Sequence, residues 1–217
     1  TLPFAATQLL GGFSFTLGLF LILGAGAELF TGNCLMVSSL LDRRCSLAGM
    51  LRSWVIVYLA NFAGSLLVAA AFYFVLTFTL GRLMLWVERR YKVIKVAAAK
   101  CSLSFPNALV LGILCNLLVC LGVLMAMSAK DNTGKILSAY LPIAFFVLCG
   151  FEHSVANMFY LPAGILAAGR YGVAAEGVSW ASMWTGNLLP VTLGNILGGC
   201  LVGVVYWAVY LRRGRRA

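Results

Sequence analysis

Two long apolar stretches of this chain are each interrupted by the same polar pattern. Residues 26–33 read GAELFTGN and residues 150–157 read GFEHSVAN, so each copy has Gly-x-Glu followed by an Asn five residues after the Glu. The sequence around each copy is also similar, with NFAGSLLV at 61–68 and NILGGCLV at 195–202. Polar interruptions at corresponding places in two halves are typical of broken membrane helices that line a substrate path. We therefore predict a duplicated chain with one broken helix in each half.

The apolar stretches are too long and too poor in charge for a soluble domain. The chain is 62% hydrophobic and 10% charged, whereas about a quarter of the residues in a typical soluble protein are charged. Residues 51–80 contain Arg52 as their only charged residue. Residues 136–169 contain Glu152 as their only charged residue, and His153 follows it. This composition predicts an all-α membrane protein with several spanning helices.

Five membrane-spanning segments are predicted, and two of them exceed the roughly 20 residues that one crossing needs. We predict that the first is broken at Glu28–Asn33 and the fourth at Gly150–Ser154. A basic amphipathic segment, Arg82–Cys101, separates the second from the third and is expected to lie along the membrane surface. The five segments cover residues 8–41, 53–80, 105–127, 136–168 and 187–211.

The two halves are of unequal length. The second half, residues 101–217, has a full span before its broken helix and another after it, whereas the first half, residues 1–80, has no opening span. Residues 81–100 connect the halves. Because the chain also begins with Thr-Leu-Pro and not with Met, we expect that one N-terminal helix is missing and that a complete version has three spans in each half.

The net charge is +10, and the basic residues lie between and after the apolar spans. They form no face of basic and aromatic residues of the kind that would indicate nucleic-acid binding. If five spans alternate, one side of the membrane has nine Lys and Arg residues, including those of Arg212–Arg216, and the other has seven. Because Lys and Arg favour the cytoplasmic side, we expect a multi-pass protein of the inner membrane with a cytoplasmic C-terminus. Six of the seven opposing cations lie in Arg82–Lys100, where a basic outer vestibule would attract anions.

The cysteines and the single histidine differ in what they indicate. Seven cysteines are scattered singly without a Cys-x-x-Cys pair, so we expect neither a metal nor another cofactor. His153 lies in the second predicted break beside Glu152. Ionisable groups inside a membrane mark functional sites, and histidine titrates near neutral pH, so we predict a functional role for His153. Thr31 offers a hydroxyl group toward the path from the other break.

The two glutamates occupy equivalent positions and are predicted to have a structural role. We expect Glu28 and Glu152 to accept hydrogen bonds from backbone N–H groups that become free where each helix breaks. Four asparagines in and after the motifs are expected to serve the same purpose: Asn33, Asn157, Asn61 and Asn195.

Four separate motifs, in the same order, closely resemble the formate/nitrite transporter family, which also includes hydrosulfide channels. They are GAELFTGN, LGILCNLLVCL, GFEHSVANMFYLPAGI and NLLPVTLGNILGG. The resemblance covers nearly the whole chain, FEHSVANM alone is highly specific, and the first helix of the family has no counterpart here. It implies an aquaporin-like protomer with an inverted repeat of three plus three helices, its own pore, and assembly into a homopentamer in the lipid bilayer.

The resemblance also implies roles for individual residues. His153 corresponds to a central histidine that is hydrogen-bonded to a threonine, here Thr31. Lys100, sixteen residues before Asn116, corresponds to a lysine ahead of the family's fourth helix, and Asn116 lies beside the constriction. The apolar constrictions of the family fall on Phe15, Leu19, Phe30, Val119 and Phe146.

The implied function is a passive or proton-coupled channel for small monovalent weak-acid anions. Formate is the first candidate, and nitrite and hydrosulfide are alternatives. A charge at the bilayer centre costs at least about 2.5–3.5 kcal/mol, so we predict that Lys100 attracts the anion and that His153 then protonates it or forms a hydrogen bond to it.

Two function classes remain as alternatives. An intramembrane enzyme would use Glu152, His153 and a cysteine, but the sequence has neither a set of metal ligands nor a convincing pair of nucleophile and base. A channel for water or neutral solutes would have a similar architecture. The paired Asn-Pro-Ala signatures expected of such a channel do not occur here, and it would have no use for Lys100 and His153.

Overall fold

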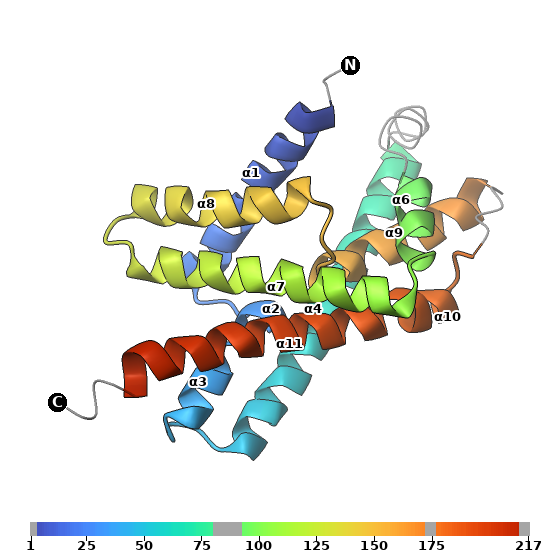
Figure 1. Cartoon of the computed structure of the whole chain (residues 1–217). Coiled ribbons are helices and arrows are strands. Elements are labelled where there is room, and N and C mark those ends of the chain that lie inside the picture. The colour runs from blue at the N-terminus through green and yellow to red at the C-terminus, as the bar shows by residue number, and fades with distance from the viewer. Residues whose placement is uncertain (1–3, 80–92, 172–176, 213–217) are drawn as a thin grey trace.

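The computed structural model describes residues 4–79, 93–171 and 177–212, and within these ranges the chain is helical with short connections and no strand (Figure 1). The predicted all-α fold is therefore confirmed. The helices of the first part are α1 (Phe4–Ala25), α2 (Phe30–Asn33), α3 (Met36–Leu41), α4 (Leu47–Thr79) and α6 (Val93–Cys101). Those of the second part are α7 (Phe105–Ser128), α8 (Asn132–Leu148), α9 (Ser154–Tyr171), and a continuous run of α10 (Trp180–Ser182), the π-helical turn η1 (Met183–Leu188), α11 (Leu189–Tyr206) and the π-helical turn η2 (Trp207–Leu211).

Two of the five predicted spans are pairs of helices. Four helices in the described ranges are long and apolar enough to cross a membrane, namely Ala6–Ala25, Leu47–Phe74, Phe105–Ser128 and Trp180–Leu211. The predicted first span consists of the first of these and a short apolar helical stretch, Phe30–Leu41. The predicted fourth span consists of two shorter apolar helices, Asn132–Leu148 and Ser154–Gly169.

A glycine with positive φ lies at each helix break. Gly26 (φ 70°) follows the last residue of α1, and Gly150 (φ 66°) follows shortly after the end of α8. Residues with a side chain rarely adopt this left-handed conformation, which commonly ends helices. The first break lies slightly earlier than predicted, at residues 26–29, because Phe30–Asn33 is already helical as α2. The second agrees with the prediction except that Ser154 already belongs to α9.

Helix α7 lies between α8 and α11 (Figure 1), and its contact with α11 depends on glycine. A Cβ atom on Gly194 would overlap the carbonyl oxygen of Leu109, and one on Gly198 would overlap that of Ile113. Small residues of this kind let two membrane helices approach until their backbones touch. The close contact brings the polar side chains of α7 and α11 to both helix breaks.

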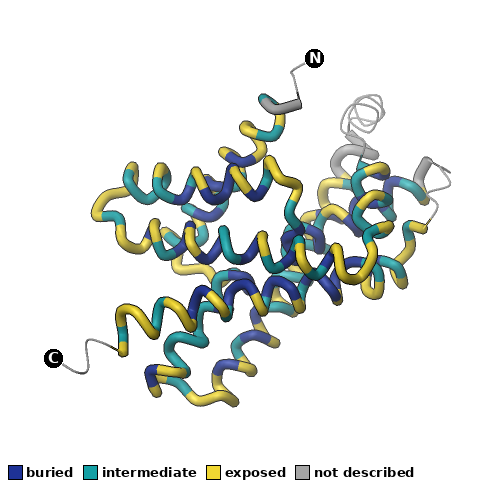
Figure 2. The backbone as a smooth tube through the Cα atoms, viewed as in Figure 1, coloured by how far each residue is buried: buried dark blue, intermediate teal, exposed yellow. Residues whose placement is uncertain are grey.

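The remaining helices surround this pair and expose apolar side chains. Helix α1 packs against α8, while α4 and α6 both pack against α9. Exposed positions follow the outer faces of the helices (Figure 2), and they include large apolar residues such as Leu21, Leu67 and Leu141. An apolar outer surface suits contact with lipid or with other membrane helices.

The predicted basic surface segment is described only in part. Arg82, Arg89, Arg90 and Lys92 lie outside the described residues. Its C-terminal portion forms α6, which packs against α9 and η1 and carries Lys100 in its last turn. This portion is therefore attached to the helices that carry the second break.

Candidate functional site

Asn61 of α4 holds the first helix break together. Its Oδ1 accepts a hydrogen bond from the backbone N–H of Phe30 (2.9 Å), and its Nδ2 donates to the backbone carbonyl of Glu28 (3.2 Å). The carboxylate of Glu28 accepts a third bond from Nδ2 of Asn33 (2.8 Å). One side chain thus caps α2 and also ties down the chain that precedes it.

Asn195 of α11 makes the same bonds at the second break. Its Oδ1 accepts from the backbone N–H of Ser154 (2.8 Å), and its Nδ2 donates to the backbone carbonyl of Glu152 (3.0 Å). The carboxylate of Glu152 accepts from Nδ2 of Asn157 (2.6 Å). The sequence repeat therefore corresponds to a repeated set of three hydrogen bonds.

The donors to the glutamates differ from the prediction. We expected Glu28 and Glu152 to accept the free backbone N–H groups, but at both breaks an asparagine takes that N–H. Within the described ranges, the two carboxylates accept hydrogen bonds from side chains only. A carboxamide suits the capping position because it offers an acceptor to the N–H and donors to a carbonyl at the same time.

Asn116 of α7 connects the two breaks. Its Nδ2 donates to the backbone carbonyl of Thr31 in α2 (3.1 Å) and to that of Asn195 in α11 (2.6 Å). The Asn116 side chain is fully buried. In this structure, Asn116 therefore fixes the backbone that carries the Thr31 hydroxyl.

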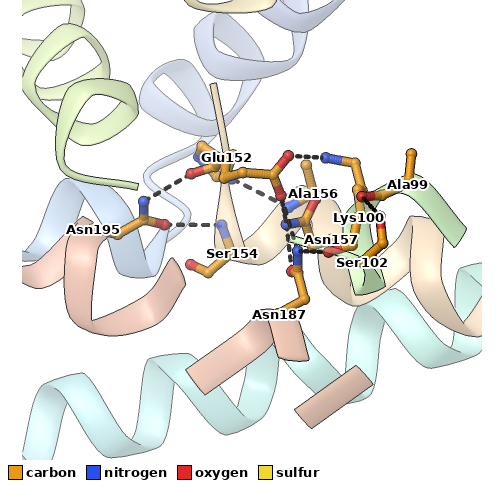
Figure 3. A network of polar contacts seen from close by, with 10 residues as sticks. Ala99, Lys100, Ser102, Glu152, Ser154, Ala156, Asn157, Asn187 and Asn195 are labelled. Atoms are coloured by element: carbon orange, nitrogen blue, oxygen red, sulfur yellow. Dashed lines mark hydrogen bonds and ion pairs between the residues drawn. The ribbon is translucent and has the colours of Figure 1, made fainter. Parts of the chain in front are cut away.

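Lys100 and Glu152 form a partly buried ion pair that sequence reasoning missed (Figure 3). The Nζ atom of Lys100 lies 2.7 Å from Oε1 of Glu152, and the two side chains are 18% and 5% exposed. Asn187 of η1 joins them, because its Nδ2 donates to Oε2 of Glu152 (3.1 Å) and to the backbone carbonyl of Lys100 (3.0 Å). Lys100 was predicted to attract the anion, and in the structure its ammonium group is paired with the Glu152 carboxylate.

His153 and Thr31 meet where the two broken helices approach each other. Nε2 of His153 lies 3.1 Å from Oγ1 of Thr31, and both side chains are almost fully buried. On the other side of the ring, the backbone N–H of Ala156 donates to Nδ1 (3.2 Å). A backbone N–H can only donate, so Nδ1 carries no proton. The ring is therefore neutral, with its proton on Nε2, and Thr31 is the acceptor.

Two phenylalanines enclose the imidazole ring. Phe15 of α1 meets it edge-on at a centroid distance of 5.3 Å, and Phe146 of α8 stacks on it at 6.0 Å. The two phenyl rings also touch each other at 5.1 Å. The site thus combines two polar contacts of the imidazole, with Thr31 and Ala156, with an apolar enclosure.

Four of the five predicted constriction residues belong to one apolar cluster. Leu19, Val119 and Phe146 are buried members of it, and Phe15 packs against them. Phe30 is buried in a separate cluster, where its ring meets those of Trp54 and Tyr58. The structure brings the first four together and does not place Phe30 with them.

A cavity of about 350 Å³ ends at this cluster. Leu19 and Val123 are buried members of the cluster that also line the cavity, whereas Phe15 and His153 are not part of its lining. Polar groups in the cavity lining come from Asn33, Ser38, Ser39 and Tyr206 among mostly apolar residues from α1, α3 and α7.

Comparison with known proteins agrees with this geometry. The sequence matches the formate/nitrite transporter family over residues 2–208. The chain belongs to the formate/nitrite transporter family. This family consists of transporters and channels, so the alternative of an intramembrane enzyme is excluded.

Individual relatives cover nearly all of the chain. A probable formate transporter of Methanothermobacter thermautotrophicus is 40% identical over 97% of this chain and 78% of its own length. The formate channel FocA of Escherichia coli K12 is 39% identical over 98% of this chain and 77% of its own length. The solved structure of a pentameric formate channel with formate bound superimposes with a TM-score of 0.79 at 34% identity, covering 97% of this chain and 86% of that one. This member of the formate/nitrite transporter family is therefore a membrane protein with the fold of a formate channel.

Proposed function

We propose that this protein is a channel for small monovalent anions of weak acids, and that formate is its physiological ion. The hydrogen-bonded pair of His153 and Thr31, enclosed by the rings of Phe15 and Phe146, is the observation that carries the proposal. The names of the relatives support formate, and the pentameric formate channel supports assembly as a homopentamer with a pore in each protomer.

The route we infer starts in the cavity and passes the apolar cluster to reach His153. An anion that enters this cluster loses its hydration, and apolar surroundings favour the neutral acid over the anion. Hydrogen bonds formed inside such a site offset part of this cost. The Thr31 hydroxyl accepts from Nε2 of His153, so its own hydrogen is free to donate to the anion.

A neutral His153 contributes a hydrogen bond and does not transfer its proton. If it gave up the Nε2 proton it would become an imidazolate, which is strongly disfavoured in an apolar site. Net protonation of the anion therefore requires that a second proton first arrives at Nδ1 and displaces the N–H of Ala156. We infer that flux of the anion alone uses the observed conformation and that proton-coupled flux uses the displaced one.

The architecture that we propose for the two halves is an inverted repeat. Residues 1–80 and 101–217 form the halves and residues 81–100 connect them, with the C-terminus on the cytoplasmic side of the inner membrane. The repeated set of hydrogen bonds made by Asn61 and Asn195 supports this arrangement. In inverted repeats of this kind, substrates bind where the broken helices meet.

Electrical recording tests the proposed function directly. Purified protein in planar bilayers should carry current with formate, and parallel recordings with nitrite and hydrosulfide rank the three anions. Liposome swelling in glycerol tests the neutral-solute alternative, and protein-free membranes provide the blank. Glycerol permeation without anion current would contradict the proposal.

Substitution of the histidine tests its assigned role. His153→Asn and His153→Phe remove the group that can accept a second proton, so the anion flux of proteoliposomes should lose its dependence on pH. Cys149→Ser changes an exposed residue four positions away and serves as the matched control. A pH dependence that survives both histidine substitutions would overturn the role of His153.

A further inference from the structure

Asn187 uses every hydrogen-bonding group of its side chain. Its Oδ1 accepts from Nδ2 of Asn157 (2.7 Å), and its Nδ2 donates to the Lys100 carbonyl (3.0 Å) and to Oε2 of Glu152 (3.1 Å). Figure 3 shows the side chain reaching into the network from the η1 ribbon. The residue is fully buried, so water does not compete for these bonds.

The backbone around Asn187 allows this position. Residues Met183–Leu188 form a π-helical turn, a rare feature that is frequent at functional sites. Gly186 lets this turn approach the end of α6, since a Cβ atom there would lie 3.0 Å from the carbonyl oxygen of Cys101. The turn therefore places a carboxamide between α6, α9 and the second break.

The two oxygens of Glu152 have different partners. Oε2 accepts from two amides, those of Asn157 and Asn187, while Oε1 accepts from Nζ of Lys100. An ammonium group has three N–H donors, and the contact with Oε1 uses one of them. Lys100 is partly exposed (18%), so the other donors can reach a small anion.

We propose that Asn187 is a positioning residue for anion attraction by Lys100. By occupying Oε2, Asn187 keeps the Glu152 carboxylate turned so that only one oxygen faces the ammonium group. Without Asn187, Oε2 keeps Asn157 as its one amide partner, and the carboxylate is freer to turn both oxygens toward the ammonium group. The inference rests on the proposed function, because it assigns Lys100 to the approach of the anion.

The first helix break has no asparagine at the position that corresponds to Asn187. Asn187 lies eight residues before Asn195, and Ser53 lies eight residues before Asn61. Ser53 makes one long contact, in which its Oγ lies 3.5 Å from Nδ2 of Asn33. A serine hydroxyl therefore replaces the carboxamide at the break where no lysine pairs with the glutamate in the described ranges.

The test compares the formate dependence of current in Asn187→Ala, Asn187→Ser and Lys100→Ala channels, with Ser53→Ala as the matched control. Loss of Asn187 should raise the half-saturating formate concentration about fivefold, the equivalent of about 1 kcal/mol, with little change in maximal current. Asn187→Ser imitates the first break and provides a second variant if the alanine protein does not fold. In the Lys100→Ala background, loss of Asn187 should add nothing, because both changes act on the same ammonium group.

A purely structural role for Asn187 would give a different pattern. It would lower the maximal current without moving the half-saturating concentration, or it would move that concentration equally in the presence and absence of Lys100, and either result overturns the proposal.

Chemical labelling separates this proposal from the proposed function. Labelling of Lys100 by a water-soluble amine reagent, read by mass spectrometry, should fall when Asn187 is removed, because the ammonium group is held more tightly. Unchanged or increased labelling contradicts the positioning role. Reduced labelling together with no anion current in the unchanged protein would instead contradict the channel function.

Discussion

The two helix breaks share a scaffold and differ in what surrounds it. Asn61 and Asn195 make equivalent bonds, but Glu28 is exposed within the chain whereas Glu152 is 4% exposed and is paired with Lys100. Each break thus has a capping carboxamide, while the lysine paired with the glutamate belongs to the second break only. The shared bonds are structural, and the differences between the halves indicate where function was added.

His153 and Thr31, which form the hydrogen bond at the site, occupy different positions of the repeat. The residue after the glutamate is Leu29 in the first copy and His153 in the second, and the third residue after it is Thr31 in the first and Val155 in the second. At these two positions, each copy therefore has one polar and one apolar side chain. The hydrogen bond between His153 and Thr31 can form only when both breaks meet.

The largest expected difference concerns the capping asparagines. Asn195→Ala leaves the N–H of Ser154 and the carbonyl of Glu152 without this partner, and it removes a bond to the carbonyl of Gly112, which keeps its place in the α7 helix. Each such group costs about 1–3 kcal/mol, so unfolding of the purified protein in detergent should occur at a much lower temperature or the protein should fail to assemble. Asn61→Ala should have a smaller effect because its site is only partly buried. Equal effects of the two substitutions would contradict the distinction between the breaks.

The next difference concerns the glutamates. Glu152→Gln keeps the size of the side chain but leaves the partly exposed Lys100 without its carboxylate, and loss of a hydrogen bond to a charged group should destabilise the protein by about 1.5–3 kcal/mol. The substitution Glu28→Gln, at an exposed site, should change the free energy of unfolding by less than about 0.5 kcal/mol. Thermal unfolding in detergent measures both. If Glu152→Gln is as mild as Glu28→Gln, the ion pair does not stabilise the break.

A smaller effect is expected on transport when the hydroxyl group is removed from the first break. Thr31→Val keeps the shape but removes the partner of His153, and the loss of one hydrogen bond should lower formate flux about tenfold, equivalent to ~1.4 kcal/mol. Thr31→Ser should retain most of the flux. Val155→Thr adds a hydroxyl at the corresponding position of the other break and should leave the flux within about twofold. Full flux through the valine variant would show that the anion does not need this hydroxyl.

The smallest effect is expected at Ser53. Its contact with the break is the 3.5 Å approach of Nδ2 of Asn33 to its Oγ atom, at the outer limit for a hydrogen bond. Ser53→Ala should therefore change the free energy of unfolding by less than about 0.5 kcal/mol, as measured by thermal unfolding in detergent. A loss as large as that of Glu152→Gln would mean that the first break depends on Ser53 in a way that this contact does not explain.

The sequence predicted the breaks well because their cause is local. A Gly-x-Glu pattern inside an apolar run interrupts a helix wherever it occurs, since the glycine adopts positive φ and the polar groups need partners. Pro106 similarly lies in the first turn of α7. The first residue of α2 was harder to predict from the sequence, because a cap from Asn61 on another helix decides where α2 begins.

The partners of the charged groups were not predictable in the same way. Nothing in the sequence near Lys100 indicates Glu152, which is 52 residues away, and Asn187 has no matching asparagine in the first half that would mark it. Phe30 was grouped with the constriction because the family resemblance implied it, and its ring contact with Tyr58 was not predicted.

The sequence by itself determined that this chain is a helical membrane protein with two broken helices, because apolar length and helix interruption are properties of short segments. It also carried the motifs that define the family. Only the tertiary structure decided which side chains complete each break, that His153 is neutral with its proton directed at Thr31, and that Lys100 is paired with Glu152. These contacts join residues from different helices, and their geometry depends on the close approach of α7 and α11, which no local pattern specifies.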